Sequence, residues 1–303
     1  MSVVLRDVTL RDGLQDEAPV STAAKLELFE ALVAAGIRDL ELTSFVRADR
    51  VPAMADAEEI VSATRARDSV TRWGLVLNER GAQRALAAGL THLQWVISVS
   101  EAHQQENAGQ SVADGVTGLR RVVELAGQAA AVVELTLATA FGCPFTGPVS
   151  PDDVARVAEA AVDAGVTALG LADTIGTAVP TEIAPAVQRV AAFGVPVGIH
   201  LHDTRGLAVA NALAAIDAGV GRVDGSVGGL GGCPFAPGAS GNLALEDLAH
   251  ALDAMGVDTG VDVDGMIEAA RVACSITGRS VQSHVGVAGP RFAGTPFSGT
   301  SGL

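Results

Sequence analysis

Short apolar runs rich in β-branched residues alternate along this chain with longer alanine-rich stretches. The runs have the length and composition of buried parallel strands, and the stretches between them have helical spacing. The expected strands cover residues 3–10, 39–45, 72–77, 92–99, 131–139, 168–174, 197–203 and 222–227. Together with the helices that follow them, they make eight strand–helix units.

Four predicted helices end in Ala-Ala-Gly or Asp-Ala-Gly, where glycine can adopt the left-handed conformation that ends a helix. Eight units within about 255 residues match a (β/α)8 TIM barrel in count and length. A doubly wound sheet is the alternative, although it would more often have fewer strands. Residues 262–278 predict one further helix, so we expect an α/β catalytic barrel with a short C-terminal helical extension over 1–278 and a flexible tail over 279–303.

Composition narrows the class of protein. The chain has 303 residues, 49% of them hydrophobic, which is enough for a sizeable core. Its formal net charge of −15 argues against a nucleic-acid partner. Neither a signal sequence nor a long apolar span is evident, so we expect a cytoplasmic protein without a membrane partner. Three widely spaced cysteines are too few for a disulfide framework.

The stretch "VGIHLHDTRG" places two histidines two residues apart in an apolar run. In a strand, His200 and His202 project from the same face. A single buried histidine is more often a hydrogen-bonded core residue, but two neutral rings on one face are harder to satisfy. The pair therefore favours a metal-binding or catalytic role.

Further polar residues come at the ends of predicted strands, and in a barrel these ends share one mouth. They are Arg11 and Asp12 at the end of the first strand, Glu41 and Thr43 in the second, Asp173 and Thr174 at the end of the sixth, Asp203 at the end of the seventh, and the segment "GGLGGCPFAPGASGN" after the eighth. Taken singly, each could be a cap or a surface charge. Together they predict that the chemistry collects at this mouth.

A mixed set of nitrogen and oxygen donors is available there. Asp12, His200, His202 and the amide oxygen of Asn242 favour a divalent ion, Mg²⁺ or Mn²⁺ ahead of Co²⁺ or Zn²⁺. Four protein ligands on an octahedral ion leave two positions for a chelating substrate. The alternative for Asn242 is an N-cap of the following helix.

Cys233 lies among the glycines of residues 228–241. Such a segment can act as a lid that brings a thiol to the substrate and excludes water. The alternative is an unreactive cysteine in a turn. Cys143, in "FGCPF", is predicted to be structural, and Cys274 to belong to the core.

Several motifs now point to a family. "TLRDGLQDE", "LTSFVRADRVPAMAD", "FGCPF", "LADTIG", "HLHDTRGLAVAN" and "GSVGGLGGCPFAPGASGNLALEDL" closely resemble the hydroxymethylglutaryl-CoA lyases. These are metal-dependent (β/α)8 enzymes of the group that includes isopropylmalate and homocitrate synthases. The resemblance runs from about residue 3 to residue 277, and the cysteine segment is its most specific part.

The resemblance implies cleavage of 3-hydroxy-3-methylglutaryl-CoA to acetyl-CoA and acetoacetate, in leucine catabolism, by a homodimer that takes a small acyl-CoA substrate. It implies metal ligands at Asp12, His200, His202 and Asn242, catalytic residues at Arg11, Cys233, Glu41, Asp173 and His200, and substrate-binding residues at Arg11, Thr174, Arg50 and Arg205. The chemistry suits these residue types. A metal can orient the tertiary hydroxyl, Arg11 can neutralise the enolate oxygen, and Cys233 can protonate the carbon.

The chain departs from the family's pattern at three positions. Ala18 stands where a lysine is common, Asp49 where a basic residue is common, and Arg205 where an aromatic residue is usual. These changes affect the expected CoA contacts, for which Arg47, Arg50 and Arg205 can compensate. The alternatives are a lyase or aldolase for another 3-hydroxyacyl-CoA or 3-hydroxy acid, a condensing synthase, and a metal-binding barrel without catalysis.

Overall fold

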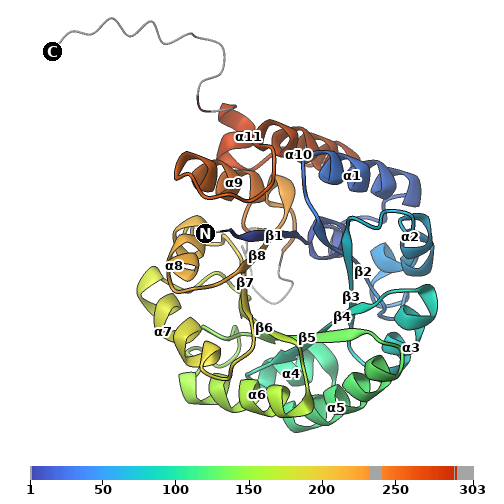
Figure 1. The fold of residues 1–303 in the computed structure, drawn as a ribbon, viewed down its shortest axis with the longest axis vertical. Helices are drawn as coiled ribbons and strands as arrows, with labels where there is room; N and C mark the ends of the chain where they lie inside the picture. Colours follow the sequence, from blue (N-terminus) through green and yellow to red (C-terminus); the bar gives the residue numbers. More distant parts are fainter. Residues whose placement is uncertain (1, 233–240, 290, 292–303) are drawn as a thin grey trace, which may run out of the picture.

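Eight parallel strands close into a barrel in the computed structural model, which describes residues 2–232, 241–289 and 291. Each strand pairs with the next in sequence, and β8 pairs with β1 to close the ring (Figure 1). The strands are β1 Val4–Asp7, β2 Asp39–Ser44, β3 Thr71–Val76, β4 His92–Ser98, β5 Val132–Ala138, β6 Ala168–Asp173, β7 Val197–Leu201 and β8 Arg222–Gly225. The predicted TIM barrel is confirmed, and the closed ring excludes an open doubly wound sheet.

Helices surround the barrel, as Figure 1 shows. They are α1 Thr22–Ala34, α2 Ala57–Ala63, α3 Glu79–Ala88, α4 Glu101–Ala108, α5 Val112–Gln128, α6 Pro151–Ala164, α7 Pro180–Ala191, α8 Ala208–Asp217, α9 Leu245–Ala254, α10 Val263–Thr277 and α11 His284–Ala288. The Ala-Ala-Gly and Asp-Ala-Gly endings work as predicted, since Gly89 and Gly165 cap α3 and α6 with φ of +100° and +95°. None of the helices in the described ranges is long and apolar enough to cross a membrane.

The C-terminal extension contains one helix that the sequence did not predict. Helix α10 forms as expected and packs against α1. Within the segment expected to be a flexible tail, however, residues 284–288 form α11. The carboxylate of Asp247 in α9 accepts hydrogen bonds from the backbone N–H groups of His284 and Val285, at 2.9 and 2.7 Å. This cap comes from another helix, so the local Gly-rich composition gives no sign of it. Residues 290 and 292–303 lie outside the described residues.

Inside the barrel, polar and charged side chains replace the branched aliphatic residues that commonly fill this fold. Along β4 and β5, the apolar residues Leu93, Trp95 and Leu135 alternate with the polar residues Gln94 and Glu134. Because alternate residues of a strand face opposite sides, the apolar set packs beneath the helices and the polar set points inward. The hydrophobic core is therefore a layer between strands and helices.

Five of the inward-facing or edge charges form what we call the interior network: Arg6, Asp39, Glu134, Arg222 and Asp224. Arg6 pairs with Asp39 and with Glu134, the latter at 3.1 Å. Arg222 pairs with Glu134 at 2.5 Å and with Asp224 at 2.7 Å. Burial opposes the charge on Asp224, but Arg222 and Arg6 hold its pKa below the usual range. The network spans the barrel and ties β1, β2, β5 and β8 together.

Gly198 in β7 provides the space for this network. A Cβ atom at Gly198 would lie only 2.2 Å from Nη2 of Arg222, so a larger residue would displace the guanidinium. The absence of a side chain here lets an arginine on the neighbouring strand lie across the barrel interior.

Two predicted strands end earlier than the sequence indicated. The first was expected to end in Arg11-Asp12, but β1 stops at Asp7, and those two residues lie in η1, a π-helical turn over Thr9–Gly13. The Asp7 carboxylate accepts hydrogen bonds from the backbone N–H and hydroxyl of Thr9, at 2.9 and 2.7 Å. These contacts turn the chain out of the strand. Burial raises the pKa of Asp7 to about 7.

The seventh strand likewise ends at Leu201, one residue before His202. His202 instead forms an isolated antiparallel bridge with Asn242. The backbone of Leu243 donates to the carbonyl of Leu201 at 2.8 Å, which brings the segment before α9 alongside the strand end. Both histidines still meet on one side, because the extended conformation continues across the strand end.

Candidate active site

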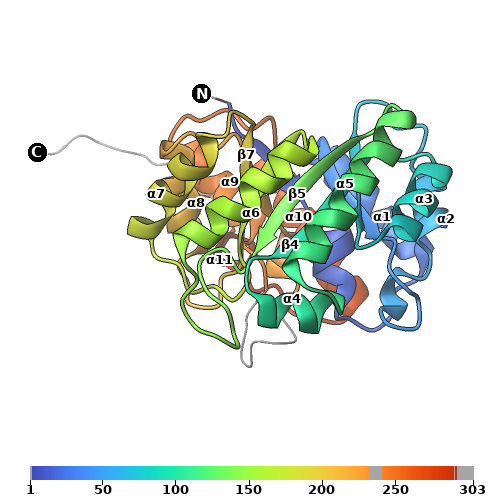
Figure 2. The same cartoon turned by 90° about the horizontal axis from the view of Figure 1, so that it is seen from below.

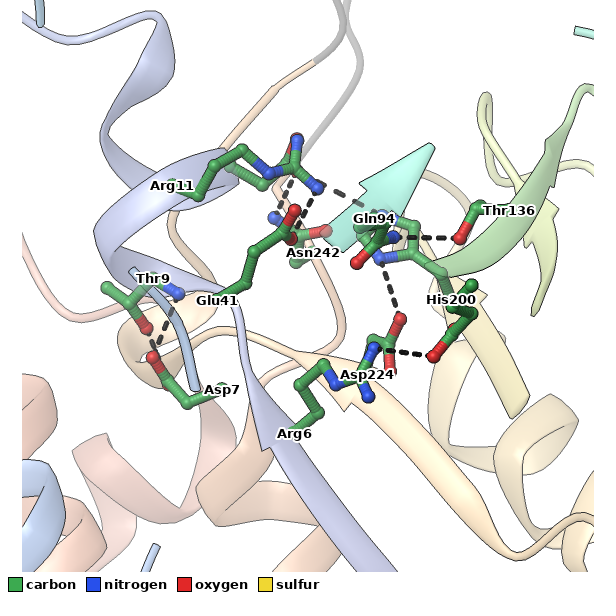
Figure 3. A network of polar contacts seen from close by, with 12 residues as sticks. Arg6, Asp7, Thr9, Arg11, Glu41, Gln94, Thr136, His200, Asp224 and Asn242 are labelled. Atoms are coloured by element: carbon green, nitrogen blue, oxygen red, sulfur yellow. Dashed lines mark hydrogen bonds and ion pairs between the residues drawn. The ribbon is translucent and has the colours of Figure 1, made fainter. Parts of the chain in front are cut away.

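Three side chains from two parts of the chain meet at the C-terminal mouth of the barrel. Asp12 comes from η1, and His200 and His202 come from the end of β7. Their ligand atoms lie within 4.8 Å of one another. Figure 3 shows the His200 ring to the right of Arg11 and Asn242 and above Asp224, and Figure 2 shows α4, which follows the C-terminal end of β4, at this end of the barrel. The sequence prediction that the histidine pair and Asp12 converge is confirmed.

The spacing of these three atoms suits a small divalent ion. The Nε2 atoms of the two histidines are 3.3 Å apart, and Oδ2 of Asp12 lies 4.0 Å from that of His200 and 3.9 Å from that of His202. A triangle with these sides has a circumradius of about 2.2 Å, close to the bond lengths of Mg²⁺ and Zn²⁺ to oxygen and nitrogen. One point can therefore be bonded to all three atoms without moving the backbone.

Asn242 adds a spare oxygen beside this cluster. Its Nδ2 donates to Oδ2 of Asp12 at 2.7 Å and to the carbonyl of Leu230 at 3.0 Å. Its Oδ1 is buried and has no hydrogen-bond partner among the described residues. The alternative role as an N-cap is wrong, because α9 begins after Ala244 and no side chain caps it. An unpaired buried amide oxygen is costly unless a ligand takes it up.

The charge states of the cluster favour cation binding. Burial lowers the pKa of His202 to about 4, with His200 adding to the effect, and burial also lowers the pKa of His200. Burial opposes ionisation of Asp12, yet Arg11 and the two imidazoles hold the pKa of Asp12 well below its usual range. Two neutral rings beside a carboxylate offer three lone pairs to a metal. Nδ1 of His202 is a further buried atom without a partner in the described ranges.

Arg11 is fixed between two carboxylates. It pairs with Asp12, and its Nη2 lies 2.8 Å from Oε2 of Glu41, which is fully buried. Burial disfavours the guanidinium charge, but Asp12 and Glu41 raise the pKa of Arg11, so the charge is retained. Burial raises the pKa of Glu41. Nε of Arg11 has no partner within the described residues and is a donor available to a ligand.

A cavity of about 600 Å³ opens above this cluster. Among its lining residues are Arg11, Asp12, Arg47, Arg50, Gln94, Thr136, Thr174, His200 and His202. Thr174 is well placed to donate, because its Oγ1 accepts from the backbone N–H of Thr139 at 2.8 Å and its hydroxyl proton is left for another acceptor. The structure thus brings Thr174 and Arg50 to the same cavity as Asp12, His200 and His202.

Two other predicted site residues are engaged elsewhere. Arg205 does not line this cavity, and its guanidinium donates to the carbonyls of Ile175 and Gly176, at 3.0 and 2.8 Å. The Asp173 carboxylate accepts from the backbone N–H groups of Thr177 and Ala178, each at 2.9 Å. Both side chains therefore shape the turn after β6, and Asp173 reaches the site only through its charge beside His202.

The cysteines divide into two groups. Cys233 and the rest of residues 233–240, the central part of the predicted lid over 228–241, lie outside the described residues. Cys143 and Cys274 are buried free thiols, and Cys274 belongs to α10, as predicted. Neither lines the cavity.

Sequence reasoning missed three polar residues inside the barrel. Gln94 donates through Nε2 to the hydroxyl of Thr136 at 2.7 Å, and both line the cavity floor. Asp224 lies beneath His200, with Oδ2 at 3.9 Å from Nδ1 of the ring. The sequence did contain a signal for them. In "RVDGSV", polar residues occupy every second position of an otherwise apolar strand, which indicates that one face of the strand is polar.

Comparison with known proteins agrees with this geometry. Residues 2–273 match the HMGL-like family model. The (R)-citramalyl-CoA lyase of Chloroflexus aurantiacus is 40% identical over 303 aligned residues, with 95% of each chain covered. The hydroxymethylglutaryl-CoA lyase YngG of Bacillus subtilis is 36% identical, over 89% of this chain and 91% of that one. An HMG-CoA lyase from Acinetobacter baumannii, solved with coenzyme A and 3-methylmalate, superposes with a TM-score of 0.93 at 36% identity, covering 97% of both chains.

Proposed function

The chain belongs to the HMGL-like family of carbon–carbon lyases, and from that premise we propose that it uses a divalent metal to cleave 3-hydroxy-3-methylglutaryl-CoA into acetyl-CoA and acetoacetate. The observation that carries the proposal is the set of three donors, from Asp12, His200 and His202, spaced to share one ion beside Arg11. Oxygen and nitrogen donors without a thiolate favour Mg²⁺ or Mn²⁺.

The reaction breaks one bond and moves two protons. The tertiary hydroxyl loses its proton, the C2–C3 bond breaks, and C3 becomes the ketone of acetoacetate. The bonding electrons pass to the thioester as an enolate, and C2 then takes a proton to become the methyl group of acetyl-CoA. A bound divalent ion would act as a Lewis acid toward the substrate's oxygens.

The protein's own side chains can assist the two steps in which charge develops on the substrate, the loss of the hydroxyl proton and the formation of the enolate. Arg11 is held by Asp12 and Glu41 and keeps a spare Nε donor, which suits it to stabilise a developing oxyanion. The burial of Arg11 strengthens that interaction. Thr174 offers a hydroxyl donor at the cavity wall. Cys233 is the proposed acid for C2, because a thiol is a far better acid than a hydroxyl.

The CoA end of the substrate would extend outward past Arg50. Arg47, on the same part of the cavity rim, pairs with Asp49 at 2.5 Å, whereas Arg50 forms no ion pair within the described residues. Arg50 is therefore the more available cation for a phosphate. The engagement of Arg205 with backbone carbonyls makes it the weaker candidate.

The similarity to (R)-citramalyl-CoA lyase supports a second candidate substrate. Citramalyl-CoA lacks one methylene between the carbinol carbon and the carboxylate, so the same cleavage would release pyruvate in place of acetoacetate. Both substrates share the 3-hydroxyacyl thioester on which Arg11 and the metal would act. The homodimer, the cytoplasmic location and the role in leucine catabolism stay predictions.

One assay separates these candidates. Purified protein loaded with Mn²⁺ is incubated with 3-hydroxy-3-methylglutaryl-CoA, with citramalyl-CoA and with the two free acids, and products are identified by mass spectrometry. We expect acetyl-CoA with acetoacetate from the first substrate, and no turnover after the metal is chelated. Pyruvate formation alone would select the second candidate. Failure to release acetyl-CoA from either thioester would contradict the proposal.

A further inference from the structure

The two ring nitrogens of His200 face different surroundings. Nε2 faces the cluster, 3.3 Å from Nε2 of His202 and 4.0 Å from Oδ2 of Asp12. Nδ1 faces into the barrel, 3.9 Å from Oδ2 of Asp224. His200 and Asp224 are register partners on neighbouring strands β7 and β8, so the pleat holds both side chains on the inner side (Figure 3).

Asp224 has one oxygen engaged and one free. Its Oδ1 accepts from Nε of Arg222 at 2.7 Å, whereas its buried Oδ2 has no hydrogen-bond partner among the described residues. The interior network contains two arginines and three carboxylates, so charges of +2 and −3 leave one negative charge over. A buried carboxylate oxygen with no donor is rare unless it serves a function.

The need to neutralise Arg222 does not by itself explain why a carboxylate is present at position 224. Nη2 of Arg222 already lies 2.5 Å from Oε1 of Glu134, which supplies a full negative charge. Asp39 is the corresponding carboxylate at the other end of the network, where it pairs with Arg6, and no contact joins Asp39 to His200 in the described structure. The distinguishing property of Asp224 is its free oxygen beside Nδ1.

We propose that Asp224 is a positioning residue that holds His200 in the tautomer with the proton on Nδ1, so that the Nε2 lone pair points into the metal cluster. The inference rests on the proposed metal site. A neutral imidazole carries one N–H and one lone pair, and the N–H is favoured beside the carboxylate. Carboxylates in this relation to metal-binding histidines fix the ring and raise its basicity. The separation exceeds a direct hydrogen bond, so a small ring movement or a bridging water completes the contact.

Asp224→Asn reverses this preference with almost no change in shape. The amide has one oxygen, which Nε of Arg222 requires as its acceptor, and the NH₂ group then faces His200. A donor in that place favours a lone pair on Nδ1 and moves the proton to Nε2, which blocks the ligand atom. We expect Mn²⁺ affinity to fall by about 10- to 100-fold, as is typical when such a supporting carboxylate is lost.

The experiment has two readouts and one matched control. Mn²⁺ affinity is measured by electron paramagnetic resonance of the free ion, and the tautomer of His200 by ¹⁵N NMR of histidine-labelled protein without metal. Asp39→Asn removes the same charge from the same network, and its Mn²⁺ affinity should stay within about twofold of wild type, since it does not touch a ligand. Wild type should carry its proton on Nδ1, and Asp224→Asn on Nε2.

Equal Mn²⁺ affinity in wild type and Asp224→Asn would overturn the inference, as would equal losses in both variants. If Asp224→Asn does not fold, the wild-type spectrum decides alone, because a proton on Nε2 of His200 contradicts the proposal. A wild-type protein that binds no Mn²⁺ but has the Nδ1 proton would contradict the proposed function and leave the positioning role supported.

Discussion

The mouth of the barrel and its lower interior both bury charged side chains, but they differ in how those groups are satisfied. In the interior network, each guanidinium lies between two carboxylates. At the mouth, buried atoms of Asn242, His202 and Arg11 have no partner within the described residues, and the interior carboxylate oxygen that likewise has none is Oδ2 of Asp224, which faces His200. Interior pairing holds strands together, whereas unpaired polar atoms at the mouth are a cost that only a ligand offsets.

This difference distinguishes charged side chains that stabilise the barrel from charged side chains that are available to bind a ligand. A buried ion pair is costly to break because the remaining partner is left uncompensated. A metal ligand adds less to folding, since its own desolvation is already unfavourable. Variants of the candidate metal ligands should therefore lose chemistry more than stability, and interior variants other than those of Asp224, which faces His200, should do the reverse.

The largest expected effect is at the mouth. Asp12→Ala or His200→Ala each removes one of three metal ligands, and turnover should fall by at least about 10³-fold, beyond the 10- to 100-fold typical of supporting residues. Metal content, measured by elemental analysis, should fall in parallel. Circular dichroism should stay near wild type in both variants, and so should the unfolding midpoint of His200→Ala, which leaves the Arg11–Asp12 pair intact. Full metal occupancy in either variant would refute the ligand assignment.

Cys233 tests the part of the site outside the described residues. Cys233→Ser should leave metal and substrate affinity nearly unchanged but lower kcat by about 10²- to 10⁴-fold, because a hydroxyl replaces the proposed acid. Steady-state kinetics at saturating substrate gives the result. Cys143→Ser, in the similar "FGCPF" motif, is the matched control and should retain near-normal turnover. Near-normal turnover by the Cys233 variant would rule out its role as the acid.

Glu134 tests the interior. It contacts both Arg6 and Arg222, at 3.1 and 2.5 Å, so Glu134→Gln leaves two buried guanidinium groups undercompensated. The free energy of unfolding should fall by about 3–5 kcal/mol, as for other broken buried pairs. Urea denaturation measures it. A loss no larger than that of His200→Ala would remove the distinction between the two regions.

Glu246 in α9 differs from both regions, because this buried carboxyl forms no ion pair with a cation among the described residues. It accepts from the backbone N–H of Gly228 at 2.8 Å, and burial raises its pKa from 4.5 to about 7. The folded state therefore keeps a proton that the unfolded state loses between these values, and stability falls as pH rises from about 4.5 to 7. Glu246→Gln should flatten this dependence and be about 1–3 kcal/mol more stable than wild type at pH 8. Unfolding curves at pH 5 and pH 8 test this, and an unchanged slope would contradict it.

The smallest effect is expected at the cavity rim. Arg50→Ala should raise KM for a CoA thioester by about two- to fivefold, the value of one exposed charge pair, and the difference should shrink with added salt. Arg205→Ala should change KM less, because its guanidinium is engaged by backbone carbonyls. An equal KM for pantetheine thioesters and CoA thioesters would argue against any phosphate contact.

The sequence predicted the features that depend on strand periodicity and on the residues at strand ends. The apolar runs located all eight strands, and the His200–His202 spacing with Asp12 located the candidate metal ligands. It misjudged the end of β1, because the Asp7–Thr9 contacts that begin η1 depend on tertiary burial. Asn242 could be read as a cap or a ligand until its contact with Asp12, 230 residues away, was known.

The interior network could not be predicted for a related reason. Arg6, Glu134 and Arg222 occur as single charges in separate apolar strands, and each alone resembles an edge residue. Their pairing depends on the closure of β1 against β8 and on the space left by Gly198. Asp224 acquires its relation to His200 only through the register of β7 and β8.

The number of Mn²⁺ ions bound per chain tests the central claim most directly. Equilibrium dialysis of wild type should give one ion, because a single ion can lie about 2.2 Å from donor atoms of Asp12, His200 and His202, which is a metal–ligand bond length. A double variant, His200→Ala with His202→Ala, should bind none, while Asp39→Asn in the interior network should still bind one. Retention of the ion by the double variant, or its absence from wild type, would contradict the account.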